Sequence, residues 1–289
     1  MSKTKLIFLH ALTPLHVGTG QAVANVDLPI AREKSTGFPI VPASAFKGVL
    51  RDEYLTTNNQ GKLIEPDWVQ QAFGTQDAAG EWMFTDLRIL CLPVRSFYGV
   101  FAYVTCPLIL KQLQRNAQVM GVPGLDHLDI EVDISKVAVP LESKLQHQHQ
   151  DKDKDKDKDK VYLEDIDLDC ALKDRAQEIG QTLAQILFDT ADQAMFLQRF
   201  AIVSNETFQF FSETGTEIVA RVRLEDYTKT VASGGLWYEE CAPTESIFYG
   251  FVAQTKTGAS HDPLKSNMML QIGGDATIGR GLCRVVIHS

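Results

Sequence analysis

At 289 residues the chain is long enough to bury a substantial core, as one large or two modest domains. Its net charge of −9 argues against free, non-specific nucleic-acid binding, because that affinity comes mainly from neutralising phosphates. No apolar run approaches the roughly 18 residues that cross a bilayer, and the N-terminus lacks a convincing signal peptide, so cytoplasm is the default location. The five cysteines, no two of them closer than fifteen positions, fit neither a zinc knuckle nor a redox pair.

The charge is unevenly distributed along the chain. Residues 1–51 carry six lysines and arginines against two acidic residues, a net of +4, and the other 238 residues carry −13. A basic segment within an acidic chain indicates a localised track for a polyanion, with the acidic remainder facing protein partners.

Hydrophobic periodicity predicts a mixed order of strands and helices. Strands are expected over 5–12, 82–91, 98–106, 200–203, 218–224, 247–255 and 277–287, and helices from residue 45 and over 66–73, 107–118 and 170–188. The intervening loop 13–41 is long for a compact domain, which favours a functional role for it. Because strands and helices mix without strict alternation, the predicted fold class is α+β.

The first predicted helix carries a candidate anion site. Pro39 and Pro42 keep the preceding chain extended, so Ser44 is predicted to be the N-cap. Ser44, Lys47 and Arg51 then share the face opposite the apolar stripe, beside the positive end of the helix dipole. A hydroxyl, an ammonium and a guanidinium that point one way suit phosphate. The alternative is an ordinary solvated helix face.

Two glycine-rich loops are further phosphate-binding candidates. One is the turn Gly18-Thr19-Gly20, and the other holds Gly273, Gly274, Asp275, Gly279, Arg280 and Gly281. Glycine lacks a Cβ, so backbone amides can approach phosphate closely, and Arg280 adds a charge. Both loops lack the lysine of a Walker loop, which argues against an NTPase. A plain turn between strands is the alternative.

Two segments have the character of insertions. Residues 145–160 contain alternating Asp and Lys, which cannot bury apolar surface and predict a surface loop of almost no net charge. Residues from about 205 to 243 predict a projecting, thumb-like basic hairpin with Arg221, Arg223 and Lys229 beside a Ser-Gly-Gly turn. A solvent-facing hairpin without a ligand is the alternative.

Several stretches carry a resemblance to a known family. They are LHVGTG, VDLPIARE, PASAFKGVLR and IGGDATIGRGLCRV, with PVRSFYGVFAYVTCP at 93–107, RFAIVSN at 199–205 and TEIVARVRLEDYTKTVASGGLWYEECAP at 216–243. Outside 145–160 the chain resembles the RAMP superfamily of CRISPR ribonucleoproteins, and within it the repeated backbone subunit of the type III-B (Cmr) effector. The resemblance implies a single domain over 1–289 with an RNA-recognition-motif-like (ferredoxin-like) palm and inserted helical and β-hairpin thumb elements.

The resemblance also implies an activity. Copies of such a subunit stack head to tail along a guide RNA, with other Cmr subunits, and cleave complementary target RNA at regular intervals. Asp27 stands at the position of the cleavage residue, as a base or as a holder of Mg²⁺ or another divalent cation; without the family it reads as a turn residue. RNA supplies its own 2′-hydroxyl, so the protein adds geometry, charge stabilisation and proton transfer.

Three other residues are weaker candidates for the cleavage site. His16 can position the phosphate or move a proton, and a hydrogen-bonded structural histidine is the alternative. Glu239 or Glu240 is a candidate contributed from another subunit.

Two rival functions stay open at this level. The chain can be a non-catalytic RNA-binding scaffold, or a RAMP endoribonuclease that processes CRISPR precursor RNA as a free enzyme. Cleavage by an Asp27 variant separates the first from the nuclease, and activity of the isolated monomer on repeat hairpins would identify the second.

Overall fold

The computed structural model describes residues 4–20, 26–147, 159–255 and 263–289. Contacts within it divide the chain into two compact units. Unit 1 comprises Met1–Arg88, Thr216–Thr244 and Phe248–Ile287, and unit 2 comprises Ile89–Gly215, Glu245–Ile247 and His288–Ser289. No helix in these described ranges is long and apolar enough to cross a membrane.

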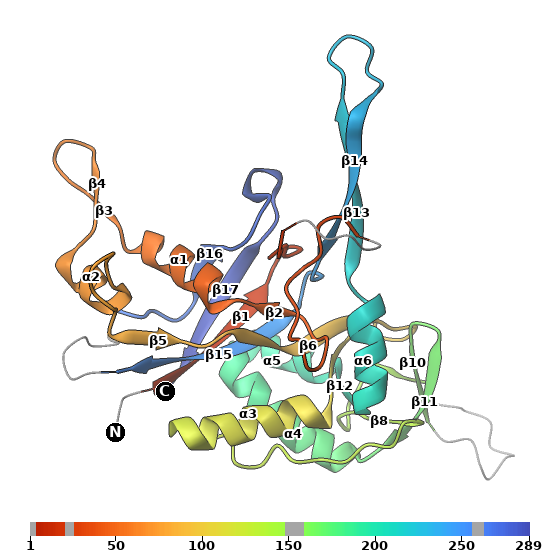
Figure 1. Cartoon of the computed structure of the whole chain (residues 1–289). Coiled ribbons are helices and arrows are strands. Elements are labelled where there is room, and N and C mark those ends of the chain that lie inside the picture. Colours follow the sequence, from red (N-terminus) through yellow and green to blue (C-terminus); the bar gives the residue numbers. More distant parts are fainter. Residues whose placement is uncertain (1–3, 21–25, 148–158, 256–262) are drawn as a thin grey trace, which may run out of the picture. The chain divides into compact units, whose positions relative to one another are not determined.

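Unit 1 is built on a sheet around β1 (Thr4–Ala11; Figure 1). Strand β1 is buried from Leu6 onward. Hydrogen-bonded neighbours follow in the order β16 (Met268–Gln271), β17 (Leu282–His288), β1 and β15 (Ile247–Gln254). Antiparallel pairs add β5 (Trp82–Phe84) to β15, and β2 (Ile40–Val41) to the start of β6 (Leu87–Arg95). A run of consecutive buried residues is typical of a strand that is covered on both faces.

Helix α1 (Ala43–Glu53) packs against β16 and against α2 (Asp67–Phe73), and the short strands β3 (Thr56–Thr57) and β4 (Leu63–Ile64) pair between the two helices. The prediction that Ser44 caps α1 is wrong. The helix begins at Ala43 with Pro42 in the cap position, and the Ala43 amide donates to Asp86 Oδ1 at 2.8 Å. A carboxylate from the connection between β5 and β6 therefore does the work of the cap, a contact that local sequence cannot show.

Unit 2 holds a second set of paired strands. Their order is β6, β7 (Phe101–Thr105), β12 (Phe200–Val203), β8 (Lys136–Ala138), β11 (Ile166–Ala171), β10 (Lys160–Leu163) and β9 (Gln146–His147). The pairs β7–β12 and β8–β11 are parallel, and the others are antiparallel. The predicted Asp-Lys loop falls largely on 148–158, which lie outside the described residues.

Four helices accompany these strands: α3 (Pro107–Met120), α4 (Lys173–Leu187), α5 (Thr190–Leu197) and α6 (Asn205–Thr214). Helix α4 packs on α5, β12 and β8, with residues such as Ile179 and Leu183 buried. Helices and mostly antiparallel strands thus occur together in a mixed fold, as the α+β prediction expects at its coarsest level.

Predicted and observed elements differ mainly at their boundaries. The predicted strand 82–91 divides into β5 and β6 at Thr85 and Asp86. The helix predicted from Cys170 begins at Lys173, because residues 166–171 pair as β11 with β8 and β10. The strand predicted over 277–287 begins at Leu282, after a 3₁₀ turn, η1 (Ala276–Ile278).

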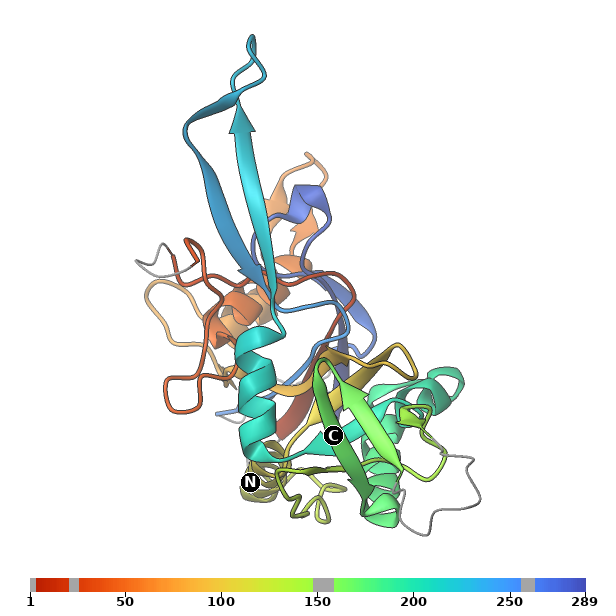
Figure 2. The same ribbon diagram turned by 90° about the vertical axis from the view of Figure 1, so that its right-hand side faces the viewer.

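The predicted thumb region starts at about residue 205, whereas the hairpin in the structure starts at Glu217. Residues 205–214 form α6 of unit 2, because the Ser204 side chain accepts a hydrogen bond of 3.1 Å from the Thr207 amide and caps a helix there. The hairpin consists of β13 (Glu217–Leu224) and β14 (Val231–Cys241) and extends from the sheet of unit 1 (Figures 1 and 2). Its pairing is regular up to Val222 opposite Leu236, beyond which residue 223 faces a bulge over 232–235.

Candidate nucleic-acid interface

Asp27 lies at the base of the β13–β14 hairpin. Its segment runs beside β14, where the Leu28 amide donates to Tyr238 O and the Glu240 amide donates to Leu28 O, both at 3.0 Å. The Asp27 side chain is exposed, and its Oδ2 accepts a hydrogen bond of 2.8 Å from the Tyr238 amide. The strand therefore fixes one carboxylate oxygen, and Oδ1 has no hydrogen-bond donor among the described residues.

His16 is attached to the same strand. Its Nδ1 lies 2.6 Å from Glu240 O, and since a carbonyl only accepts, Nδ1 carries the hydrogen and Nε2 is the unprotonated nitrogen of the neutral ring. The His16 ring packs against Gly18, where a side chain would not fit, because a Cβ on residue 18 would lie 2.7 Å from Nε2. Tyr238 and Glu240, which hold Asp27 and His16, are about 7 Å apart along the strand. The structure thus brings the two predicted cleavage residues to one place.

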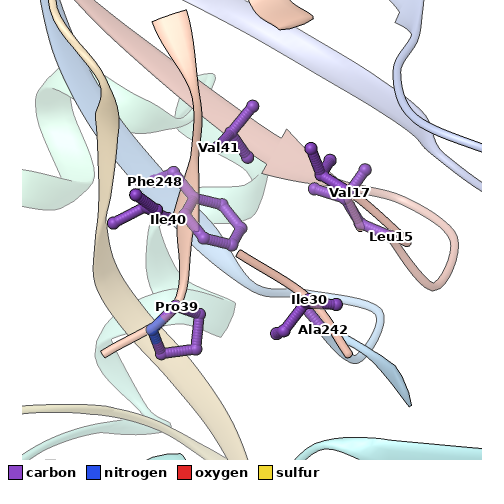
Figure 3. Close-up of a pocket in the computed structure, with 8 residues that line it drawn as sticks. All are labelled: Leu15, Val17, Ile30, Pro39, Ile40, Val41, Ala242 and Phe248. Carbon is purple, nitrogen blue, oxygen red and sulfur yellow. The ribbon is translucent and has the colours of Figure 1, made fainter. Parts of the chain in front are cut away.

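An apolar cluster anchors the loop that carries both residues. Figure 3 shows its side chains: Leu15, Val17, Ile30, Pro39, Ile40, Val41, Ala242 and Phe248. The space they leave is about 10 Å³, at most the volume of one water, so this cavity is not a ligand site. Leu15 and Val17 are buried while His16 between them is half-exposed, which is the alternation of an extended chain. Residues 15–17 of the predicted loop 13–41 are therefore held to the core at alternate positions.

Glu239 is buried in an ion-pair cluster. Its Oε2 accepts from Arg221 Nε at 2.8 Å, its Oε1 accepts from Trp237 Nε1 at 3.1 Å, and Arg221 Nη2 donates to Asp275 Oδ2 at 2.8 Å. Burial by itself raises the pKa of Glu239, but the hydrogen bonds from Arg221 and Trp237 outweigh it and lower the pKa to about 2. This carboxylate is ionised and fully used within its own unit.

Glu240 has a separate set of partners. Its Oε2 accepts from the Ile30 amide at 3.0 Å, and its Oε1 accepts from Thr216 Oγ1 at 2.9 Å and from the Arg32 guanidinium at 2.5 Å. Glu240 is 6% exposed, so it fastens the loop to β14 from inside. Neither glutamate presents a free carboxylate at this surface, and the hypothesis that one of them serves another copy stays a prediction.

The C-terminal glycine-rich loop packs against the segment that carries His16. The Gly274 amide donates to His16 O and the Gly281 amide to Pro14 O, both at 2.9 Å. A Cβ at Gly273, whose φ is +82°, would lie 2.1 Å from His16 O. Glycine is required at this position by backbone packing, whether or not a phosphate binds.

The far end of that loop is more open. Gly279 is exposed, with φ +81° and no atom within 4 Å of an added Cβ, and its amide donates to Ala276 O at 3.1 Å, so a phosphate could approach the Cα of this residue but not its N–H. Arg280 Nη1 donates to Cys241 Sγ at 2.8 Å, which turns this guanidinium toward β14. Gly279 is therefore better placed than Arg280 for a direct contact with RNA.

On α1, part of the predicted anion face is free. Ser44 is exposed, and Lys47 has no ion-pair partner among the described residues. Gly48 adds exposed helix backbone, with nothing within 4 Å of an added Cβ. Arg51 is engaged instead: its Nη2 donates to Glu65 Oε2 at 2.9 Å, a pair that raises the pKa of Arg51 and lowers the pKa of Glu65.

The hairpin is less basic than the sequence predicts. Arg221 is neutralised by its two carboxylate partners, and Arg223 and Lys229 are exposed near the tip. Glu225 and Asp226 lie in the same turn, so the tip itself carries no net charge. The hairpin's electrostatic attraction for RNA is therefore small.

Sequence reasoning missed two groups that shape the site. The amide of Tyr238 orients Asp27, and Asp86 occupies the N-terminus of α1. Tyr238 lies in the family-like stretch GGLWYEE, but a role played by a main-chain amide leaves no signature in residue type. Asp86 carries no local signal, because its partner is 43 positions away.

Known proteins share both the sequence and the fold of this chain. The family model described as the RAMP superfamily matches residues 8–284. The "CRISPR system Cmr endoribonuclease Cmr4" of Pyrococcus furiosus is 33% identical over 307 residues, which cover 99% of this chain and 96% of that protein. The crystal structure of oligomeric Cmr4 from Pyrococcus furiosus is 26% identical, covers 100% of this chain and 98% of the other, and superposes with a TM-score of 0.72.

A more distant structure agrees in fold. A chain of the type III-B Cmr-β complex bound to cognate target RNA has a TM-score of 0.75 at 20% identity, covering 99% of this chain and 97% of that one. Both the family model and the 33% identical relative span nearly the whole sequence. The chain therefore belongs to the RAMP superfamily and, within it, to the Cmr4 family.

Proposed function

We propose that this chain is a backbone subunit of a type III-B CRISPR effector, which binds guide RNA as a head-to-tail filament and cleaves complementary target RNA at regular intervals. The observation that carries the proposal is the exposed Asp27 carboxylate, fixed by the Tyr238 amide beside a half-exposed histidine whose Nδ1 is held by Glu240 O. The naming of the Pyrococcus furiosus relative as an endoribonuclease supports it, as does the oligomeric form of that relative's crystal structure.

Cleavage at this site uses the RNA's own nucleophile. A 2′-hydroxyl of the target attacks the adjacent phosphate once the backbone is held in line, and the 5′-oxygen leaves with a proton. Asp27 either takes the hydroxyl proton or holds a cation against the phosphate. It does so through Oδ1, because Oδ2 already accepts a hydrogen bond from the Tyr238 amide. The leaving 5′-oxygen takes its proton from water, or from His16 Nε2 after that nitrogen has itself taken up a proton, since Nδ1 is held by Glu240 O.

A divalent cation here would be shared with the RNA. Mg²⁺ commonly binds one or two carboxylates and completes its coordination with water and substrate phosphate. Asp27 supplies one such carboxylate, and the described residues contain no group of three or more His, Cys, Asp or Glu side chains placed to hold a metal ion. This donor set fits a cation that Asp27 and a phosphate bind together, where it neutralises developing charge.

Guide RNA binding is assigned to two surfaces of unit 1, the exposed face of α1 and the C-terminal glycine-rich loop. Ser44, Lys47 and the bare backbone of Gly48 form the free part of the α1 face, and Gly279 exposes backbone in the C-terminal loop. These groups recognise backbone and carry no base-edge readout. We assign to the hairpin the role of separating the guide strand from the target strand near each cut.

The architecture is proposed to follow the family. We extend the proposal to a ferredoxin-like palm, a thumb at β13–β14 and a single RAMP domain, which the match of the family model over residues 8–284 supports. Each unit is assembled from three separate chain segments, as expected when insertions interrupt one domain. A cytoplasmic location and the other Cmr subunits as partners belong to the same proposal.

The test is target cleavage by the assembled, guide-loaded complex. Asp27→Asn is expected to leave assembly and RNA binding intact and to abolish the regularly spaced cuts, because it keeps the side-chain shape and removes the charge. Asp77→Asn, at an exposed aspartate elsewhere in unit 1, is the matched control and should cut normally. Loss of cutting in a chelator would show that the cation takes part.

The rival functions give different results in the same assay. Equal cutting by wild type and Asp27→Asn would place the active site elsewhere and leave this chain as a scaffold. Cutting of precursor repeat hairpins by the isolated chain would identify a processing enzyme.

A further inference from the structure

The segment that carries Asp27 lies against β14 without being part of a strand. Residues 26–39 form isolated bridges, such as that of Leu28 with Glu239, and regular pairing begins at β2. A segment held by isolated bridges opens more easily than one in a continuous ladder, because each opening breaks few hydrogen bonds. The position of the Asp27 carboxylate therefore depends on the side-chain contacts of its own segment.

Arg32 makes two contacts that hold this segment. Its Nη1 donates to Gly37 O at 2.7 Å, within the turn that follows, and its Nη2 donates to Glu240 Oε1 at 2.5 Å on β14. The guanidinium is a rigid, planar fork, so the two bonds fix the turn relative to the strand. Arg32 thus ties the Asp27 segment to the strand whose Tyr238 amide binds the Asp27 carboxylate.

Glu240, the partner of Arg32, contacts both parts of the proposed cleavage site. Its carbonyl accepts from His16 Nδ1 at 2.6 Å, and its amide donates at 3.0 Å to the carbonyl of Leu28, the residue after Asp27. Its carboxylate also accepts from the Ile30 amide at 3.0 Å. A shift of Glu240 would therefore move the histidine and the aspartate segment together.

The Glu240 carboxylate depends on Arg32 for its countercharge. Glu240 is 6% exposed, and among the described residues Arg32 is its one cationic partner. A buried charge that loses its partner is strongly unfavourable, so removal of the guanidinium would drive the carboxylate toward water. That movement would break its bond to the Ile30 amide and loosen the strand contacts that hold His16 and Asp27.

We propose that Arg32 is a positioning residue for target cleavage, which keeps Asp27 and His16 in one geometry by neutralising Glu240. Its guanidinium is engaged by Gly37 O and by the Glu240 carboxylate, so it acts through these groups. The inference rests on the proposed function, in which Asp27 and His16 act on the target. Such a role affects the rate strongly, because a misplacement of about 1 Å costs on the order of a hundredfold.

Single-turnover cleavage by a saturating amount of the guide-loaded complex tests the proposal. Arg32→Met is expected to lower the cutting rate about tenfold or more, with target affinity unchanged, because the RNA-binding surfaces stay in place. Adding Glu240→Gln should raise the rate at least about threefold above that of Arg32→Met, since a neutral amide needs no countercharge and its oxygen can still accept from the Ile30 amide. A general loss of stability would lower the amount of assembled complex and leave the rate per complex unchanged.

Arg88→Met is the matched control. Arg88 pairs with Glu33 of the same segment at 2.9 Å, but the two side chains are 36% and 20% exposed, against 24% and 8% for Arg32 and Glu240. A more exposed ion pair contributes less, so this variant should cut like wild type. An equal loss of cutting in both arginine variants would assign the effect to attachment of the loop in general and overturn the specific role of Arg32.

Amide hydrogen exchange of the purified full chain gives a readout that does not involve cleavage. The amides of Leu28, Ile30 and Ala31 donate to Tyr238 O, Glu240 Oε2 and Val17 O. They should exchange about tenfold faster in Arg32→Met and at the wild-type rate in Arg88→Met. Unchanged exchange in Arg32→Met would overturn the positioning role.

The two assays together separate this inference from the proposed function. If Asp27→Asn cuts normally, the proposed function fails, whereas faster exchange in Arg32→Met still supports the hold on the segment. If Asp27→Asn is inactive and Arg32→Met cuts normally, the positioning role alone fails. Weaker target binding by Arg32→Met, without rescue by Glu240→Gln, would make Arg32 a phosphate ligand instead.

Discussion

At the scale of single residues, the carboxylates at the base of the hairpin differ in their availability. Glu239 is 5% exposed, ion-paired to Arg221 and hydrogen-bonded to Trp237, so both of its oxygens have donors, and its pKa of about 2 makes it a poor base. Asp27 is bound to the amide of Tyr238, the residue before Glu239. Its side chain is exposed, and its Oδ1 has no hydrogen-bond donor among the described residues. Position on the same strand does not make the two equivalent, because burial decides which carboxylate a substrate can reach.

Gly48 provides a residue-scale prediction. Gly48→Ala is expected to stabilise the fold by about 0.5–1 kcal/mol, because an exposed helical glycine loses more backbone entropy than alanine on folding. It should nevertheless weaken guide binding, since the added methyl occupies open space beside Ser44, on the face where we place a phosphate. Thermal unfolding and RNA binding of the same variant measure the two effects. An unchanged RNA affinity would move the guide away from this face of α1.

At the scale of elements, one arginine links two segments that are far apart in sequence. Arg221 of β13 binds Glu239 of β14 and Asp275 of the C-terminal loop, and that loop in turn holds the main chain at His16. The hairpin base, the C-terminal loop and the His16 segment are therefore one connected arrangement within unit 1. Breaking it is expected to misplace Asp27 and His16, the proposed cleavage residues, without changing either of them.

Two glycines of the C-terminal loop separate packing from ligand access. Gly273 and Gly279 have nearly the same φ, +82° and +81°, but only Gly273 has a backbone oxygen, His16 O, where a Cβ would lie. Gly279→Ala is expected to cost about 1–2 kcal/mol from the left-handed conformation alone, and Gly273→Ala clearly more. Denaturant unfolding of both variants measures the difference. Equal costs would mean that the loop moves freely away from His16.

The pH dependence of stability tests the ion-pair cluster. The pKa of Glu239 is about 2 in the folded chain against an ordinary value of 4.5, so its contribution is complete above pH 4.5 and is lost as pH falls toward 2. The stability difference between wild type and Glu239→Gln should shrink by about 1.4 kcal/mol per pH unit in that window. Glu225→Gln, at an exposed position of the same hairpin, serves as the control and should show no such trend. A pH-independent difference would contradict the cluster.

At the scale of the whole molecule, the negative charge belongs to one unit. Unit 2 has 21 acidic residues against 13 lysines and arginines, and unit 1 has 16 against 15. An acidic protein can therefore bind RNA through unit 1, which is nearly neutral overall and basic in its first 51 residues. The excess of acidic residues on unit 2 fits contacts with proteins, because an RNA backbone would be repelled there.

The sequence by itself determined the elements whose signals are local. The buried strand β1, the helices α2 and α3 and the turn glycines follow from periodicity and backbone preference, which act over a few residues. It also indicated the family, because VDLPIARE and GGLWYEE are contiguous motifs, and with it the candidates Asp27 and His16.

Only the tertiary structure decided which charged groups are free. Asp86 replaces the expected cap at α1, Glu65 binds Arg51, and Asp275 with Glu239 binds Arg221, each across a long stretch of chain. Ion pairing and main-chain hydrogen bonding depend on distance in space, and residue type alone does not encode which of several carboxylates comes within reach. For the same reason the hold of Tyr238 on Asp27 appears only once the chain is folded.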